Sequence, residues 1–266
     1  MATEYRYHHF TTKLLFHDLR FHRDSKRPGE TLPEFDLPTT EAARIATEDF
    51  VGDRPLFLVT GSMTCPMTAS AIPSLKRLYA QCGDDVAFVM LNVREAHPGE
   101  NYPQPEALEE KADHARALKD TYQMPWTVAV DDLDGTLNIA MDAKPNSTYL
   151  MDRDGKIVFR SIWGRDEGNI SRALENVKRN EPPAKRESRA MVRPLVSAVG
   201  SVHEVIRRAG PRAQRDHWLS NPPMEFAGRV ASLFRPLSPD RRGVAAVATL
   251  GTATALVLGV LFLVFL

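Results

Sequence analysis

The residue best placed for chemistry in this 266-residue sequence is Cys65, which lies in the stretch GSMTCP between an apolar run and a segment with helical spacing. A cysteine at the N-terminus of a helix feels the positive end of the backbone dipole and unpaired amide N–H groups. Both features favour the thiolate over the thiol. Pro66 suits the first turn of a helix, where its missing N–H costs nothing. We therefore expect Cys65 to be a nucleophile rather than only a small buried apolar residue.

The rest of the cysteine chemistry follows from what surrounds Cys65. The third residue after it is Thr68, so a CxxC disulfide exchange cycle is excluded. Cys82, the one other cysteine, is about 20 Å or more away along an intervening helix, and we interpret it as structural. Two cysteines are also too few for a disulfide scaffold. Cys65 would then be restored by an external thiol, with no bound cofactor and no metal.

A nucleophilic thiolate needs a proton donor nearby, and the segment REAHPG offers one in His97. It follows the second of two apolar runs that we predict to be neighbouring parallel strands. The carboxyl ends of such strands face the same crevice, so His97 and Cys65 would share it. His97 could stabilise the thiolate or protonate a leaving group near neutral pH, with Arg94 or Glu95 tuning its charge. The alternative is a plain surface histidine.

These residues need a scaffold, and the pattern of residues 55–178 predicts an α/β one. Short apolar runs without alternation indicate buried strands, and apolar residues at helical spacing indicate helices. A turn of the DG type joins the last two strands as a hairpin. The order implies a thioredoxin-like mixed sheet with helices on both faces. The expected strands are 55–60, 86–91, 127–130, 147–151 and 157–160, and the expected helices are 66–81, 105–122, 133–141 and 167–178.

The segments flanking this domain are less regular. Residues 1–30 form an N-terminal extension, aromatic and rich in histidine, which we expect to pack on the domain or on a partner. The domain itself would span residues 31–180, entering through a short extended piece at 34–37 and a short helix at 39–49. A linker rich in proline and arginine, residues 181–242, follows. Residues 243–266 complete the chain.

Charge is divided unevenly between these parts. Lysine plus arginine and aspartate plus glutamate both total 34, so there is no overall basic field and we expect no nucleic-acid partner. Residues 181–242 nevertheless hold 12 basic and 6 acidic residues, and 11 of the 12 are arginine. Apolar residues at helical spacing in 195–206 and 226–234 predict two amphipathic helices. They would lie on an anionic membrane surface or pack against the domain.

Residues 243–266 contain no charge and no proline, and as a helix they would extend about 36 Å, longer than the hydrocarbon core of a bilayer requires. We expect a transmembrane helix here, in preference to a buried core helix. Arg241 and Arg242 precede it, which places the catalytic domain on the cytoplasmic side. The apolar run near the N-terminus is too short for a signal peptide. The expected topology is a single-pass tail anchor in a reducing compartment.

The segments RPLFLVTGSMTCP, REAHPGE and STYLMDRDGKIVFRSIWG, in this order, resemble the iodothyronine deiodinase family of the thioredoxin-like superfamily, over about residues 54–177. The entry PGETLPEFDLPTT also resembles that of redoxins. The resemblance implies that Cys65 stands at the selenocysteine, and it puts Ser62, Thr64, Glu95 and His97 at active-site positions. Met63 stands where many of these enzymes have a neighbouring cysteine, and Arg94 replaces an acidic residue. The expected anchor is C-terminal, whereas animal deiodinases carry theirs at the N-terminus.

The leading hypothesis is a membrane-anchored thiol oxidoreductase of deiodinase-like type. Cys65 would attack a small-molecule electrophile such as an aryl halogen or a peroxide, and thioredoxin or a low-molecular-weight thiol would restore it. The identity of the substrate is not decided, because a thiolate is a weaker catalyst than a selenolate. The sequence is also compatible with a homodimer. The alternatives are a one-cysteine peroxiredoxin, although Leu58 breaks the expected P-x-x-x-T-x-x-C pattern, and a non-catalytic thioredoxin-fold interaction module.

Overall fold

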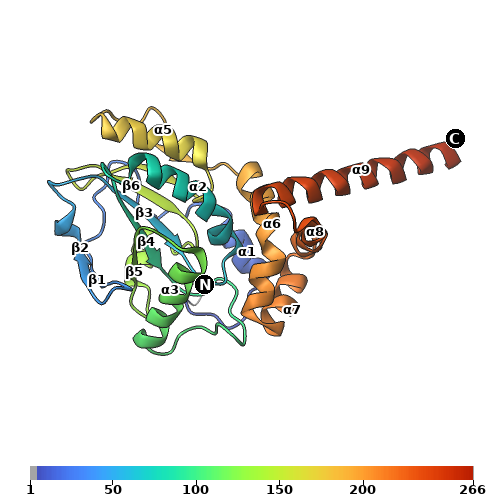
Figure 1. Ribbon diagram of the computed structural model, residues 1–266, viewed down its shortest axis with the longest axis horizontal. Coiled ribbons are helices and arrows are strands. Elements are labelled where there is room, and N and C mark those ends of the chain that lie inside the picture. The colour runs from blue at the N-terminus through green and yellow to red at the C-terminus, as the bar shows by residue number, and fades with distance from the viewer. Residues whose placement is uncertain (1–4, 266) are drawn as a thin grey trace.

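A six-stranded mixed sheet forms the centre of the structure, a computed structural model that describes residues 5–265 without the side chains of residues 257 and 259–265. The strand order is β5-β4-β3-β6-β7-β8. β3, β4 and β5 are parallel, and β6 runs antiparallel to both β3 and β7. Figure 1 shows the helices around this sheet. The strands are β3 (Leu56–Gly61), β4 (Ala87–Asn92), β5 (Thr127–Val130), β6 (Thr148–Met151), β7 (Ile157–Ser161) and β8 (Glu187–Ser188).

The core lies on both faces of this sheet, which explains the continuous apolar runs. In β3, Phe57 and Val59 point to one apolar cluster, whereas Leu56 and Leu58 point to a second one on the opposite face. Every residue of β3 and β4 is buried. The first cluster includes residues of α2 (Pro66–Cys82), α3 (Leu108–Tyr122) and α5 (Glu167–Lys178), and the second includes residues of α4 (Thr136–Met141). The prediction of a thioredoxin-like α/β fold is confirmed.

The predicted helix at residues 39–49 is wrong. The chain instead forms a small hairpin of β1 (Asp36–Pro38) and β2 (Arg44–Ala46), followed by the 3₁₀ turn η1 (Thr47–Asp49). Ala42 adopts a left-handed backbone conformation in the turn between the two strands, which a continuous helix does not permit. Within this segment Ile45 packs against the second core cluster, and Phe50, directly after it, belongs to that cluster.

The described part of the N-terminal extension, residues 5–30, packs on the domain, which was one of the two expected alternatives. It contains the short helix α1 (Thr12–Asp18). The guanidinium of Arg94, a buried group, lies over the rings of Tyr5 and Tyr7. The Nζ of Lys144, which has no exposed surface, donates a hydrogen bond to the carbonyl of His17. These buried cations hold the extension in place. The sequence of the extension has no regular apolar spacing that would have predicted these contacts.

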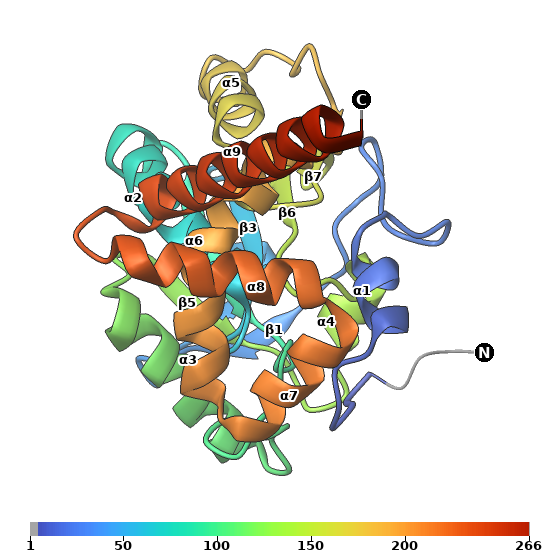
Figure 2. The same ribbon diagram turned by 90° about the vertical axis from the view of Figure 1, so that its right-hand side faces the viewer.

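Three helices follow the domain, where two amphipathic segments were expected. They are α6 (Val192–Ala209), α7 (Pro211–Ser220) and α8 (Pro222–Ala231), and the turn η2 (Ser232–Phe234) ends the group. Figure 2 shows α6, α7 and α8 stacked on one side of the domain. The apolar face of α6, with Val199, Val202 and Val205, is buried. Packing, rather than a membrane surface, therefore covers this first amphipathic face. We use the name cap for residues 192–231.

The last helix, α9 (Pro239–Phe265), extends away from the body of the structure (Figure 1). It includes most of the segment expected to be a transmembrane helix. That expectation is not supported: none of the helices, as far as their residues are described, combines the length and the apolar character needed to cross a bilayer. Residue 266 lies outside the described chain.

Candidate active site

Cys65 lies at the junction predicted from the sequence. It is the N-cap residue of α2, with Pro66 at the first helical position, and it follows the end of β3 after a short loop. Cys82 lies at the other end of the same helix, and both cysteines are free thiols. Cys65 is only 2% exposed. The helix start that positions the sulfur is therefore as expected, but the degree of burial is greater than the sequence indicated.

Burial decides the protonation state of this thiol. Burial raises the pKa of Cys65 to about 11. Hydrogen bonds from Thr68 and from the backbone of Met67 lower the pKa, but their effect is smaller. The helix N-terminus thus favours the thiolate as expected, but removal from water has the larger effect. For this buried sulfur the balance of these effects therefore favours the thiol, which differs from the expected thiolate. A thiol is a much weaker nucleophile than a thiolate.

The loops after β3 and β4 are joined by a buried hydrogen-bond network. Thr64 donates to Oε2 of Glu95 through its backbone N–H at 2.9 Å and through its hydroxyl at 2.6 Å. The same hydroxyl oxygen accepts the backbone N–H of His97 at 3.0 Å. On the other side, Oε1 of Glu95 lies 3.1 Å from Nδ1 of His114. Glu95 is 1% exposed, so these partners replace the water that a carboxylate otherwise needs.

Further hydrogen bonds fix the same two loops. The hydroxyl of Ser62 accepts the N–H of Ala96 at 3.2 Å. The side chain of Gln104 accepts the N–H of Glu95 and donates to its carbonyl, which pairs the two residues as in a strand ladder. The hydroxyl of Tyr7 donates to the carbonyl of Ala96 at 2.9 Å. Ser62, Thr64, Glu95 and His97 therefore lie together, as expected, and all four are buried.

Aromatic rings surround the imidazole of His97. The ring of Phe10 lies 4.1 Å from it, centroid to centroid, and the ring of His217 lies 5.2 Å away in an edge arrangement. Burial, followed by the proximity of His217, lowers the pKa of His97 well below its usual value. His97 is thus a neutral imidazole at pH 7.

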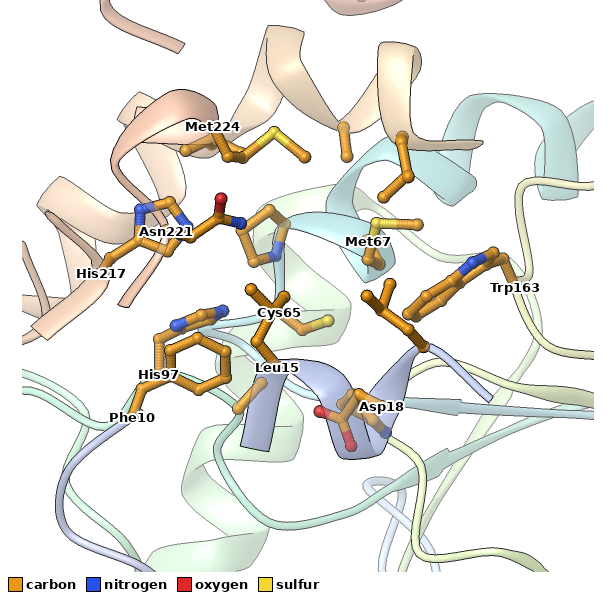
Figure 3. Close-up of a pocket in the computed structure, with 17 residues that line it drawn as sticks. Phe10, Leu15, Asp18, Cys65, Met67, His97, Trp163, His217, Asn221 and Met224 are labelled. Carbon is orange, nitrogen blue, oxygen red and sulfur yellow. The ribbon is translucent and has the colours of Figure 1, made fainter. Parts of the chain in front are cut away.

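Cys65 and His97 line one small pocket with a volume of about 70 Å³. Figure 3 shows the pocket between α1, the start of α2 and the cap. Its walls are mostly apolar, and a 150 Å³ apolar cavity is the size that accommodates benzene. A substrate with an aromatic ring therefore needs the pocket to open. The other lining residues include Phe10, Leu15, Asp18, Met67, Pro145, Trp163, His217, Asn221 and Met224.

Sequence reasoning missed several of these residues. Gln104 and His114 belong to the Glu95 network, and they come from the segment leading into α3 and from α3 itself. Phe10 comes from the N-terminal extension, and His217 and Met224 come from the cap. A histidine within the apolar spacing of α7 could have been noticed. However, His217 is more than 100 residues from Cys65 in the sequence, and only the packing of the helices brings the two residues to the same pocket.

Comparison with known proteins decides the family. The family model described as iodothyronine deiodinase matches residues 5–180, about two thirds of the sequence. The chain belongs to the iodothyronine deiodinase family. The match includes residues 5–30 of the N-terminal extension and strands β1 to β7, and it leaves out the short edge strand β8. It ends before the cap, so the pocket of this deiodinase-family protein has one wall outside the family region.

Curated relatives agree with this assignment. A thyroxine 5-deiodinase of Sparus aurata is 28% identical over 154 residues, covering 54% of this chain and 57% of its own length. A thyroxine 5-deiodinase of Homo sapiens is 32% identical over 129 residues, covering 45% of this chain and 42% of its own length. The chain thus spans about half the length of the curated relatives it matches.

Solved structures support the fold. An uncharacterized conserved protein from Geobacillus kaustophilus superposes with a TM-score of 0.50 at 20% identity, covering 60% of this chain and 87% of that one. A hypothetical protein, SMc02350, from Sinorhizobium meliloti 1021 gives a TM-score of 0.50 at 16% identity, covering 64% of this chain and 95% of that one. At these identities the likeness concerns the fold alone.

Proposed function

We propose that this protein is a thiol-dependent reductive dehalogenase in which Cys65 is the single nucleophile. The observation that carries the proposal is the joint position of Cys65 and His97 in one pocket of a deiodinase-family domain, with Thr64 and Glu95 fixing the two loops. The substrate class is an iodinated aromatic compound, and iodothyronines are the first candidates because the relatives are named thyroxine deiodinases.

The first half of the reaction removes the halogen. His97, a neutral base, takes the proton of the Cys65 thiol, and the resulting thiolate attacks the iodine of the substrate. The carbon–iodine bond breaks and a sulfur–iodine bond forms. The electron pair of the broken bond stays on the carbon, which receives the proton from His97. The sulfur is oxidised and the aromatic carbon is reduced.

The second half restores the enzyme. The thiolate of an external thiol attacks the sulfur of the Cys65 sulfenyl iodide, releasing iodide and leaving a mixed disulfide. A second thiol then displaces Cys65, which returns as a thiol, and the two external thiols leave as a disulfide. Cys82 takes no part, because it lies at the opposite end of the 17-residue helix α2. The reductant is therefore a thioredoxin or a low-molecular-weight thiol.

Iodide release measured with an iodothyronine and excess dithiothreitol tests this proposal. Cys65→Ser should abolish iodide release, whereas Cys82→Ser, the matched control at the second thiol, should retain most of it. Equal activity in wild type and Cys65→Ser would refute the mechanism. Hydrogen peroxide serves as a competing substrate: oxidation of Cys65 orders of magnitude faster than a free thiol, without iodide release, would instead identify a peroxidase.

We propose in addition that the cap and α9 lie against an anionic membrane surface. Large apolar side chains are exposed along α7, α8 and η2, with Leu219 at 70%, Phe226 at 52% and Leu233 at 78%. Arg215 of α7 and Arg229 of α8 lie in the same helices, and Arg235 follows η2 directly. The charge of arginine complements acidic lipid headgroups. α8 and α9 lie on the same side of the structure in Figure 2.

Flotation with lipid vesicles tests this second proposal. Vesicles containing phosphatidylserine should carry the protein, and vesicles of phosphatidylcholine alone should carry much less. The double variant Phe226→Ser, Leu233→Ser should reduce flotation at least several-fold. Ile139→Ser is the matched control, since Ile139 is 51% exposed on α4, away from the cap. Equal flotation of both variants would contradict the proposed surface.

A further inference from the structure

The cap brings a second imidazole into the pocket, on a helix outside the region that matches the deiodinase family. His217 of α7 is 3% exposed and lines the pocket together with Cys65 and His97. Figure 3 shows the ring of His217 on the cap side of the pocket, beside Asn221 and on the same side of the pocket as His97. The chemistry of the proposed function requires a proton to leave the thiol and return to carbon, so a second titratable ring here needs an explanation.

Glu225 of α8 holds His217 in one orientation. Its Oε2 lies 3.0 Å from Nδ1 of His217, and the carboxylate has no exposed surface. Burial would raise the pKa of Glu225, but hydrogen bonds from His217 and Arg229 lower it below its usual value. As an ionised carboxylate, Glu225 only accepts hydrogen bonds, so Nδ1 of His217 carries a proton. Nε2 is then the nitrogen of His217 that remains for the pocket.

His97 lacks such a partner. Its Nδ1 is buried and has no hydrogen-bond partner among the residues that the structure describes, and the residue as a whole is 8% exposed. The two rings meet edge to face, 5.2 Å apart. Two imidazoles at this distance do not both become cationic without cost, because like charges in a buried site repel. Of the two rings, the one with a carboxylate at hydrogen-bond distance is that of His217.

We propose that His217, oriented by Glu225, is a positioning residue that acts through His97 and accepts the proton that His97 takes from Cys65. This inference rests on the proposed function. The S–H bond of Cys65 breaks and its proton goes to His97, while a proton passes from His97 to Nε2 of His217. The products are a thiolate, a neutral His97 and an imidazolium beside the Glu225 carboxylate. The reverse transfer supplies the proton that the dehalogenated carbon needs.

Other charged groups surround this pair and bear on its pH dependence. Glu225 also faces Nε of Arg229 at 3.1 Å and Nδ1 of His203 at 3.7 Å, on α8 and α6. The pocket contains the carboxylate of Asp18 from α1. On α7 itself, the carboxylate of Asp216 pairs with Nδ1 of His9, in the N-terminal extension, and with Nε of Arg215.

Hydrogen bonds hold the cap against the loop that contains His97. The backbone N–H of Asn101 donates to the carbonyl of Ala209 at 3.0 Å. The backbone N–H of Arg212 donates to Glu100, and its guanidinium donates to the carbonyl of Gly99. These bonds join the segment just after His97 to the junction of α6 and α7. The position of His217 relative to His97 is therefore fixed by the same loop that carries His97.

The test measures alkylation of Cys65 by iodoacetamide as a function of pH, with each cysteine followed separately by peptide mass spectrometry. His217→Gln should reduce the alkylation rate of Cys65 at pH 7 about tenfold, which corresponds to a shift of about one pKa unit. Glu225→Gln should act in the same direction. His8→Gln is the matched control, since His8 is exposed. If His217→Gln lowers activity but leaves the alkylation profile of Cys65 unchanged, His217 is merely structural and the proposal is overturned.

Two further readouts keep the test decisive. In iodide release, His217→Gln should lower kcat with little change in KM, because substrate binding is retained. In the wild-type protein, ¹⁵N resonances of His217 should show a protonated Nδ1 in the neutral ring; a proton on Nε2 instead would overturn the proposal without any variant. If no iodide is released but the alkylation shift is found, the dehalogenase function fails while the role of His217 stands.

Discussion

Thr64→Val tests the hydrogen-bond network that joins the loops after β3 and β4. The substitution keeps the shape of the side chain and removes the hydroxyl that donates to Glu95 at 2.6 Å and accepts from the N–H of His97 at 3.0 Å. A hydrogen bond to a charged group contributes about 1.5–3 kcal/mol, and a buried N–H left without a partner costs about 1–3 kcal/mol. Because part of each loss is relieved by relaxation, we expect the free energy of unfolding to fall by about 2–4 kcal/mol.

Urea unfolding followed by circular dichroism measures this loss directly, provided that the slope of the transition is unchanged. Thr121→Val is the matched control: Thr121 is exposed on α3, so its substitution should change stability by less than about 0.5 kcal/mol. The effect should also be non-additive with Glu95→Gln, since both variants remove the same interaction. A loss below 0.5 kcal/mol for Thr64→Val would refute the reasoning that this hydroxyl fixes the site.

Two other predictions follow from burial of the site. Burial raises the pKa of Cys65 from 9.0 to about 11, so the folded protein holds the thiol proton more tightly than the unfolded chain does. The free energy of unfolding should therefore fall as pH rises from about 9 to 11, by at most about 1.4 kcal/mol per pH unit. The slope should be smaller in Cys65→Ala, and equal slopes in urea unfolding would contradict the pKa shift. Gly99→Ala should loosen the cap, since a Cβ there would overlap the backbone carbonyl of Ala209, and alkylation of Cys65 at pH 8 should become several-fold faster. Gly168→Ala, with open space around it, is the control, and no difference between the two variants would show that the cap does not control access.

The sheet and the position of Cys65 could be predicted because they depend on local signals. Apolar runs of four to six residues specify buried strands, and Pro66 marks the start of α2. Grouping His97 with Cys65 needed one further rule, that adjacent parallel strands end at the same edge. Ser62 and Thr64 came from the resemblance to the family, which also placed Glu95 at an active-site position. In the structure Thr64 donates to Glu95, and Ser62 accepts the N–H of Ala96.

The remaining features depend on long-range packing, which a single sequence does not display. Burial of Cys65 results from the N-terminal extension and the cap, two segments that meet over the pocket from opposite ends of the chain. The apolar face of α6 gave the same pattern that a membrane-surface helix would give, because periodicity does not identify what a helix packs against. The error at residues 39–49 arose in the same way, from apolar spacing that serves a hairpin.

The most direct test of the central claim is the covalent state of Cys65 during turnover. Wild-type protein is mixed with an iodothyronine and a limiting amount of a low-molecular-weight thiol, quenched with acid, and analysed by peptide mass spectrometry. We predict a mixed disulfide between Cys65 and the added thiol, in proportion to the iodide released, with Cys82 unmodified. Iodide release without any modification of Cys65, or with the modification on Cys82 instead, would contradict the account.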